Sequence, residues 1–224
     1  MNIYNSLYIY ILMVIFIKTI GIIMRNFQEN NKIFIGTRKD LFRKLYDYNV
    51  KVIGIPVDND YAKTIELVNE CDGIILSGGD NFIDEDFLLV KYLHKNNIPT
   101  LGICLGMQTM ARCFSDLEEV DVVNHKLSDS NGHYINIYKD TLLCKIMKTD
   151  RIFVNSRHKS AIIDTNLCIS SRAEDNIIEA VEDSEKKFFL GVEWHPESLD
   201  DLYSKKLFDY FIDVCNKYCS KIFP

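Results

Sequence analysis

Two segments far apart in the chain carry residue types that together could hydrolyse an amide bond. The first places Cys104 between Gly102 and Gly106, directly after the apolar stretch Pro99–Ile103. Glycines at these positions permit a tight strand-to-helix turn, because a Cβ there would collide with neighbouring backbone. Such a turn sets the Cys104 thiol at a helix N-terminus, where unpaired N–H groups and the helix dipole favour the thiolate. The pattern is typical of a cysteine nucleophile.

The second segment, Trp194-His195-Pro196-Glu197, supplies a base and a carboxylate. Pro196 biases His195 towards extended backbone, in which residues two apart point to the same side, so Glu197 can orient the imidazole. Cys104, His195 and Glu197 are therefore a candidate nucleophile–base–carboxylate triad. Core packing remains the expected role of four other cysteines: Cys71, Cys113, Cys144 and Cys168.

These segments resemble the class I glutamine amidotransferase superfamily, whose domains hydrolyse the γ-amide or γ-glutamyl bond of a glutamate derivative. Gly73–Asp80, with the sequence Gly-Ile-Ile-Leu-Ser-Gly-Gly-Asp, is similar to the strand and loop that supply an oxyanion-hole N–H in that superfamily. Val154–His158, with the sequence Val-Asn-Ser-Arg-His, resembles the γ-glutamyl-γ-aminobutyrate hydrolase (C26 peptidase-like) branch. The resemblance runs from about Lys18 to the C-terminal helix.

The resemblance implies a cysteine-dependent hydrolase that forms a γ-glutamyl thioester on Cys104 and releases glutamate and an amine. The backbone N–H groups of Gly79 and Leu105 would form the oxyanion hole. Four further residues would bind the substrate: Gln108, Asn155, Ser156 and His158. His125 is similar to a histidine near the site in that branch, whereas His133 is expected at the surface. No metal and no organic cofactor is expected.

Leu105 departs from the hydrolase branch, which often has arginine after the nucleophile, and matches ammonia-supplying glutaminase subunits. The first interpretation is a stand-alone hydrolase of a γ-glutamyl conjugate such as γ-glutamyl-γ-aminobutyrate. The alternative is a glutaminase subunit that delivers ammonia to a separate synthetase. The third is a degenerate binding module, which the joint presence of nucleophile, base, carboxylate and glycine loop disfavours.

Composition is typical of one enzyme domain, with 224 residues of which 47% are hydrophobic and 26% charged. The net charge of −6 argues against nucleic acid or an anionic membrane as the main partner. The expected partners are a small-molecule γ-glutamyl amide or glutamine, with a homodimer or a synthetase also open. Seven cysteines without a regular framework indicate a reducing compartment, and hence the cytoplasm. Cys215 and Cys219, without nearby histidines, make a poor zinc site.

Residues 1–17 are the least typical part of the chain. Leu7–Ile17 is an apolar run that is too short to cross a bilayer, and no Lys or Arg precedes it. We expect residues 1–17 to be an extension outside the fold, with Met13 as a candidate start, and residues 18–224 to form a single catalytic domain. A membrane anchor is the less favoured alternative.

The remaining chain alternates between strand and helix patterns, which predicts an α/β fold. By resemblance it is the three-layer, flavodoxin-like arrangement: a mainly parallel central sheet, flanking helices and additional antiparallel strands. Thr37 with Asp40 predicts a capping box. Predicted strands are 19–24, 50–55, 74–76, 98–103, 133–138, 152–155, 167–171, 177–181 and 188–193, and predicted helices are 37–48, 62–69, 84–95 and 202–218. Because ligands collect beyond the carboxyl ends of parallel strands, Cys104 and the Gly78-Gly79 loop should face one cleft.

Overall fold

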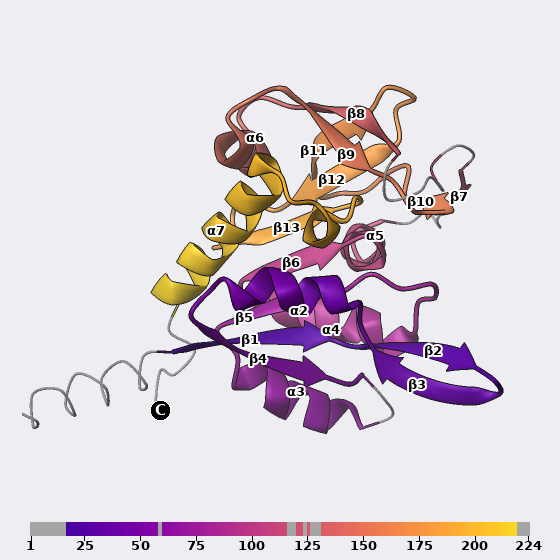
Figure 1. The fold of residues 1–224 in the computed structure, drawn as a ribbon, viewed down its shortest axis with the longest axis vertical. Coiled ribbons are helices and arrows are strands. Elements are labelled where there is room, and N and C mark those ends of the chain that lie inside the picture. Colours follow the sequence, from indigo (N-terminus) through magenta and orange to yellow (C-terminus); the bar gives the residue numbers. More distant parts are fainter. Residues whose placement is uncertain (1–16, 58–59, 116–119, 123–124, 126–130, 219–224) are drawn as a thin grey trace, which may run out of the picture.

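The computed structural model describes residues 17–57, 60–115, 120–122, 125 and 131–218. Its centre is a nine-stranded sheet in the order β4-β1-β5-β6-β13-β12-β11-β8-β9 (Figure 1). The strands from β4 to β13 in this order are parallel, and each neighbouring pair from β13 to β9 is antiparallel. The bounds are β1 Lys18–Ile23, β4 Val50–Ile55, β5 Gly73–Leu76, β6 Thr100–Ile103, β8 Gly132–Ile137, β9 Arg151–Asn155, β11 Cys168–Ala173, β12 Ile178–Glu182 and β13 Phe189–Val192.

Helices cover both faces of this sheet, which confirms the predicted three-layer α/β arrangement (Figure 1). One layer holds α2 (Lys39–Tyr46), α6 (Leu142–Met147) and α7 (Leu202–Lys217). The other holds α3 (Tyr61–Asn69), α4 (Asp84–Lys95) and α5 (Leu105–Arg112). Because successive strand residues point to opposite faces, Ile75 packs in the first core and Ile74 in the second.

The two strands that lead into the candidate site are buried along their whole length. β5 and β6 consist of four buried residues each, and they pair in parallel with Ile74 opposite Thr100. Continuous burial is expected for a parallel strand that is covered by helices on both faces. The buried strands β5 and β6 therefore lead directly to the Gly78-Gly79 loop and to Cys104.

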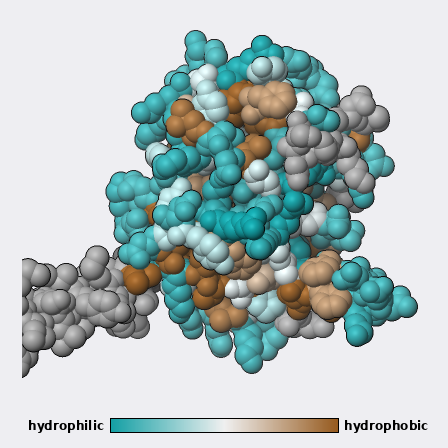
Figure 2. All heavy atoms as spheres, viewed as in Figure 1, coloured by the Kyte–Doolittle hydropathy of each residue, from teal (hydrophilic) through white to brown (hydrophobic). Residues whose placement is uncertain are grey.

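A projecting β-hairpin was not predicted. β2 (Arg25–Glu29) and β3 (Lys32–Gly36) pair antiparallel around a two-residue turn. Asn30 and Asn31 both have positive φ, of 50° and 60°, as a turn of type I′ requires. Figure 2 shows apolar and polar residues side by side on this hairpin, whose exposed apolar residues are Phe27, Ile33, Phe34 and Ile35.

Three smaller features also differ from the prediction. The expected capping box at Thr37 is wrong, because α2 begins at Lys39 and its N-cap, Arg38, makes no side-chain cap hydrogen bond. The short helix α6 was missed; Thr141 caps it by accepting a hydrogen bond from the Cys144 N–H. A small ladder between β7 (Val120–Asp121) and β10 (Ser160–Ala161) was missed as well.

The described part of the chain contains no helix long and apolar enough to cross a membrane. The expected extension lies almost wholly outside the described residues, and β1 begins directly after it at Lys18. Six described cysteines, including Cys104, are free thiols.

Candidate functional site

Cys104 forms the junction between β6 and α5. Its backbone lies at φ 50° and ψ −110°, a conformation that a residue with a Cβ adopts only under strain. The flanking glycines make this turn possible: a Cβ on Gly106 would lie 2.1 Å from the carbonyl oxygen of Leu76, and one on Gly102 would lie 2.9 Å from the Gly106 backbone. Helix α5 therefore packs directly on β5 and holds the thiol at its N-terminus.

His195 lies beside Cys104 and is oriented by Glu197. The Nδ1 of His195 is 2.7 Å from Oε1 of Glu197, which lies in a short 3-10 turn, η1 (Pro196–Ser198). A methyl group added to Gly78 would lie 3.1 Å from His195 Cε1 and 3.5 Å from Cys104 Cβ. The imidazole and the Cys104 side chain thus flank the same glycine, and all three residues of the candidate triad are buried.

The environment of Cys104 opposes the thiolate expected from the sequence. Burial raises the pKa of the Cys104 thiol well above its usual value, and the Glu193 and Glu197 carboxylates add to this. The N–H of Leu105 and the Arg157 guanidinium act in the other direction, but burial dominates. Desolvation outweighs the helix N-terminus here because the side chain is only 7% exposed.

The two residues expected to supply the oxyanion donors, Gly79 and Leu105, both lie close to Cys104. The Leu105 N–H lowers the pKa of the Cys104 thiol, although burial outweighs it, and Gly79 lines the same cavity as Cys104. A Cβ on Gly79 would lie 3.0 Å from Leu105 Cδ2, so the two backbones approach closely. Arg25, which sequence reasoning missed, supports this loop: its Nε donates to the Ser77 carbonyl oxygen at 3.1 Å.

Cys104 opens into a cavity of about 360 Å³. Gln108 closes one side, where its Nε2 donates to the Ser160 carbonyl oxygen at 2.9 Å and to the Glu193 carboxylate. His158 also faces the cavity, while its Nδ1 lies 3.0 Å from the same carbonyl oxygen. The lining residues are Gly79, Asp80, Asn81, Cys104, Gln108, Arg157, His158, Lys159 and Ser160.

Asn155 and Ser156 lie behind the cavity rather than in its wall, contrary to their expected place. The Asn155 amide clamps the backbone of the base: its Oδ1 accepts from the His195 N–H at 2.8 Å and its Nδ2 donates to the His195 carbonyl oxygen at 3.1 Å. The Ser156 hydroxyl donates to the carbonyl oxygen of His125 at 2.6 Å. Their polar atoms thus position neighbouring histidines.

Glu193 is a buried carboxyl group beside the site that sequence reasoning missed. Burial raises its pKa to about 8, His158 lowers it and Glu179 raises it further. The signal was present in the sequence, because Glu193 lies two residues before His195, as Glu197 lies two after it. Residues at this spacing share one side where the chain is extended, whereas beyond His195 the chain turns into η1.

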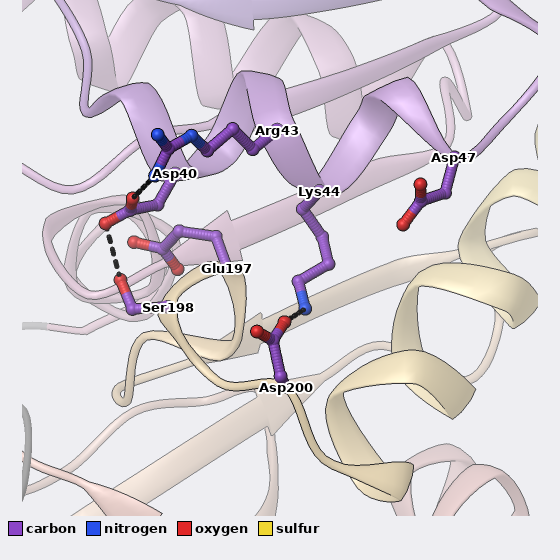
Figure 3. A pocket seen from close by; sticks show the side chains of 7 residues that line it. All are labelled: Asp40, Arg43, Lys44, Asp47, Glu197, Ser198 and Asp200. Atoms are coloured by element: carbon purple, nitrogen blue, oxygen red, sulfur yellow. Dashed lines mark hydrogen bonds and ion pairs between the residues drawn. The ribbon is translucent and has the colours of Figure 1, made fainter.

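A second, charged cavity of about 340 Å³ lies on the other side of the triad carboxylate (Figure 3). Glu197 and Ser198 form one wall, and the wall opposite comes from α2. Ser198 donates to the Asp40 carboxylate at 3.2 Å, and Lys44 pairs with Asp200 at 3.1 Å. Arg157 donates to Ser198 at 2.9 Å, which links this wall to the Cys104 cavity.

A family model described as glutamine amidotransferase class-I matches residues 33–214. A glutamine amidotransferase-like protein of Rickettsia prowazekii is 30% identical over an alignment of 234 positions, gaps included, which covers 72% of this chain and 83% of that protein. A glutamine-hydrolyzing GMP synthase subunit from Methanosarcina barkeri is 29% identical over 157 residues, with coverage of 68% and 78%.

Two solved structures share the fold. A protein described as a GMP synthase subunit, from Thermoplasma acidophilum, has a TM-score of 0.69 at 20% identity and covers 89% of this chain and 95% of its own. The CTPS glutaminase domain of Trypanosoma brucei with bound acivicin has a TM-score of 0.68 at 18% identity, with coverage of 92% and 96%. The chain belongs to the class I glutamine amidotransferase family, and its domain is that of an amide-hydrolysing enzyme.

Proposed function

We propose that this chain hydrolyses the γ-amide of glutamine at Cys104 and delivers the ammonia to a separate synthetase. The observation that carries the proposal is the arrangement around Gly78: a strained cysteine and a carboxylate-paired histidine flank this glycine, and the cysteine lines one cavity together with Gly79. The sequence alone favoured a γ-glutamyl conjugate as the substrate. We propose glutamine instead, because the Methanosarcina barkeri relative is a subunit of a glutamine-hydrolyzing GMP synthase. Leu105 supports the same interpretation.

In the proposed mechanism the thiol loses its proton as it attacks. Because burial holds the pKa of Cys104 high, its proton passes to His195 during formation of the S–C bond to the γ-carbonyl. The N–H groups of Leu105 and Gly79 hold the developing oxyanion, and such a donor is typically worth about a hundredfold or more in rate.

Collapse of the tetrahedral intermediate then breaks the C–N bond. The protonated His195 gives its proton to the departing nitrogen, so that ammonia leaves and a γ-glutamyl thioester remains on Cys104. Water, deprotonated by His195, attacks the thioester and releases glutamate together with the free thiol. Glu197 keeps the Nδ1 proton of His195 in place throughout, at 2.7 Å.

A γ-glutamyl conjugate is the second candidate substrate, and one feature of the cavity favours it. Arg157 and the exposed Lys159 lie in the wall formed by residues 157–160. Two cations there suit a leaving amine that carries a carboxylate, as γ-aminobutyrate does. Ammonia, the amine released from glutamine, carries no carboxylate with which these two cations could pair.

The test is glutamate release by the purified protein from glutamine and from a panel of γ-glutamyl amines. Cys104→Ala should abolish turnover of every substrate, whereas Cys113→Ala, which changes a half-buried cysteine outside the cavity, should retain it. Acivicin, the ligand of the Trypanosoma brucei domain, should label wild type at Cys104 and leave Cys104→Ala unlabelled.

The same panel separates the two substrates. Preference for glutamine, unchanged in Lys159→Ala, supports the glutaminase. Strong turnover of one acidic conjugate, reduced by Lys159→Ala, supports the conjugate hydrolase instead. Turnover that persists in Cys104→Ala would refute the proposed mechanism for both.

A further inference from the structure

Three histidines and one glutamate from four separate segments meet beside the Cys104 cavity. They are His125, His133 in β8, His158 after β9, and Glu179 in β12, and one ligand atom from each lies within 4.8 Å of all the others. Contrary to the expected surface position, the His133 side chain is only 20% exposed, and the other three are almost fully buried. Burial of four such polar groups together costs free energy unless hydrogen bonds or a bound charge offset the loss of water.

The hydrogen bonds around this cluster fix which ring nitrogens carry protons. His158 Nδ1 lies 3.0 Å from the Ser160 carbonyl oxygen, which can only accept, so Nδ1 is protonated and Nε2 keeps its lone pair. His125 Nε2 lies 2.8 Å from the Asp175 carboxylate, which leaves the lone pair on Nδ1. With both rings in these neutral forms, two lone pairs would face each other at 3.0 Å with no proton between them. A cation between the rings, either a proton or a metal ion, removes this conflict.

Glu179 supplies the negative charge for that cation. Neither of its carboxylate oxygens has a hydrogen-bond partner among the described residues, although the residue is 0% exposed. Its Oε1 lies 3.3 Å from His133 Nε2 and 3.7 Å from both His125 Nδ1 and His158 Nε2. Tetrahedral coordination with bonds of about 2.0–2.1 Å places neighbouring ligand atoms about 3.3–3.5 Å apart, so these separations fit one small ion.

We propose that His125, His133, His158 and Glu179 bind one divalent transition-metal ion, for which zinc is the best match. Three imidazoles and a carboxylate are zinc ligands, and four protein ligands are typical of a structural site. Asp175 on His125 and the Ser160 carbonyl oxygen on His158 are the outer partners that commonly orient metal-bound histidines.

The ionisation of the cluster is compatible with a metal ion. Burial, with a smaller contribution from His125, lowers the pKa of His133 to about 4, which keeps this ring neutral and able to coordinate. Burial raises the pKa of Glu179 to about 8, and a bound cation would reverse that shift.

The metal ion would stabilise one wall of the catalytic cavity. His158 lines the cavity and also contacts Glu193, with its Nδ1 3.2 Å from Oε1. Gln108 donates to both Glu193 and Ser160, so the same network reaches the helix that follows the nucleophile. The role is therefore positional, and no step of hydrolysis uses the ion.

The test is elemental analysis of the full-length protein after loading with zinc and exhaustive dialysis. Wild type should retain one equivalent of zinc, and its unfolding midpoint should rise on loading. His133→Gln and Glu179→Gln should each lose stoichiometric zinc. Asp175→Asn, which changes an exposed outer partner and should fold normally, is expected to bind zinc about 10–100-fold more weakly.

Two control variants locate the metal. His94→Gln changes a histidine that pairs with Asp183 at 2.7 Å outside the cluster, and Cys104→Ala removes the nucleophile; both should retain the metal. The proposal is overturned if wild type holds no stoichiometric transition metal, or if His133→Gln and Asp175→Asn bind zinc as tightly as His94→Gln does.

Discussion

At the scale of single residues, Cys104, the proposed nucleophile, is buried, and its surroundings favour the neutral thiol. Its pKa is raised, first by burial and then by Glu193 and Glu197. The thiolate fraction at neutral pH is therefore small, and it grows with pH until the pKa is reached. Reactivity in the free enzyme should follow that fraction.

We predict that iodoacetamide alkylates Cys104 slowly at neutral pH, with a rate that rises about tenfold per pH unit up to about pH 9. The measurement is peptide mass spectrometry of the Cys104 peptide over time at each pH, with the urea-unfolded protein as control. The unfolded protein should reach its plateau at lower pH. A rate that is already constant near neutral pH in the folded protein would show that the site stabilises the thiolate.

The buried ion pair between Arg25 and Asp86 holds the loop that carries Gly79. Arg25 contacts both the Ser77 carbonyl oxygen and Asp86, and its side chain is 9% exposed against 2% for Asp86. Removal of one partner would leave the other charge buried without compensation. That loss typically costs about 3–5 kcal/mol of unfolding free energy, whereas replacement of both by apolar residues is often neutral.

We therefore predict that Asp86→Ala is strongly destabilised in urea unfolding and that the double variant Arg25→Met/Asp86→Leu recovers most of the loss. The double variant still lacks the donor to Ser77, so its kcat for amide hydrolysis should fall although its stability is restored. A double variant that is as unstable as Asp86→Ala, or one with full kcat, would contradict this positioning role.

At the scale of elements, periodic hydrophobicity predicted most of the sheet and its covering helices. The bounds of β4 and α4 match the prediction at both ends, because a proline follows the strand and a polar turn closes the helix. The β2–β3 hairpin was missed because its signal is the Asn30-Asn31 turn rather than a buried face: most of its residues are exposed. Helix α6 was missed since six residues are too few to show a period.

The contact between α5 and β5 is the element packing that sets the nucleophile turn, and it depends on Gly106. We predict that Gly106→Ala lowers the unfolding midpoint strongly and lowers activity, because the new Cβ would lie 2.1 Å from the Leu76 carbonyl oxygen and neither backbone can move aside cheaply. Circular dichroism during chemical unfolding measures the effect.

Gly36→Ala is the matched control for that substitution. Its Cβ would lie 3.1 Å from Cε1 of Phe27, a ring on the exposed hairpin that can shift. A Cβ added to Gly106 would thus collide with backbone atoms, whereas a Cβ added to Gly36 would meet only a side chain that can move. Equal unfolding midpoints for the two variants would show that close packing of α5 does not set the turn.

At the scale of the whole molecule, the candidate site is assembled from both halves of the central sheet. Cys104 follows the parallel strand β6, whereas His158 follows β9 at the antiparallel edge. The sequence singled out the candidate triad because Cys104 has a local turn pattern and His195 has Glu197 two residues away, and the structure brings these three residues close together. It did not reveal the histidine–glutamate cluster, whose members come from strands and loops with no common spacing. It also did not reveal the clamp of Asn155 on His195, a contact between residues 40 positions apart.

Residue 18 is the proposed N-terminal boundary of the catalytic domain, and shortening the chain tests it. β1 lies between β4 and β5, and its first residues are held by Asp72: the Lys18 ammonium contacts Oδ1 at 3.2 Å and the Thr19 N–H donates to Oδ2 at 2.9 Å. Lys18 also donates to the Tyr218 carbonyl oxygen at 2.8 Å, which ties β1 to the end of α7. The first strand is thus anchored within the domain from its first residue.

We predict that a protein starting at Met13 has the unfolding midpoint and the glutamine turnover of the full chain, because these anchoring contacts are retained. A protein starting at Met24 loses β1 and should not fold, since β4 and β5 would then lack the strand that separates them. Thermal unfolding and glutamate release measure both variants. A large loss of stability in the Met13 protein would assign residues 1–12 to the catalytic domain and move its boundary to the start of the chain.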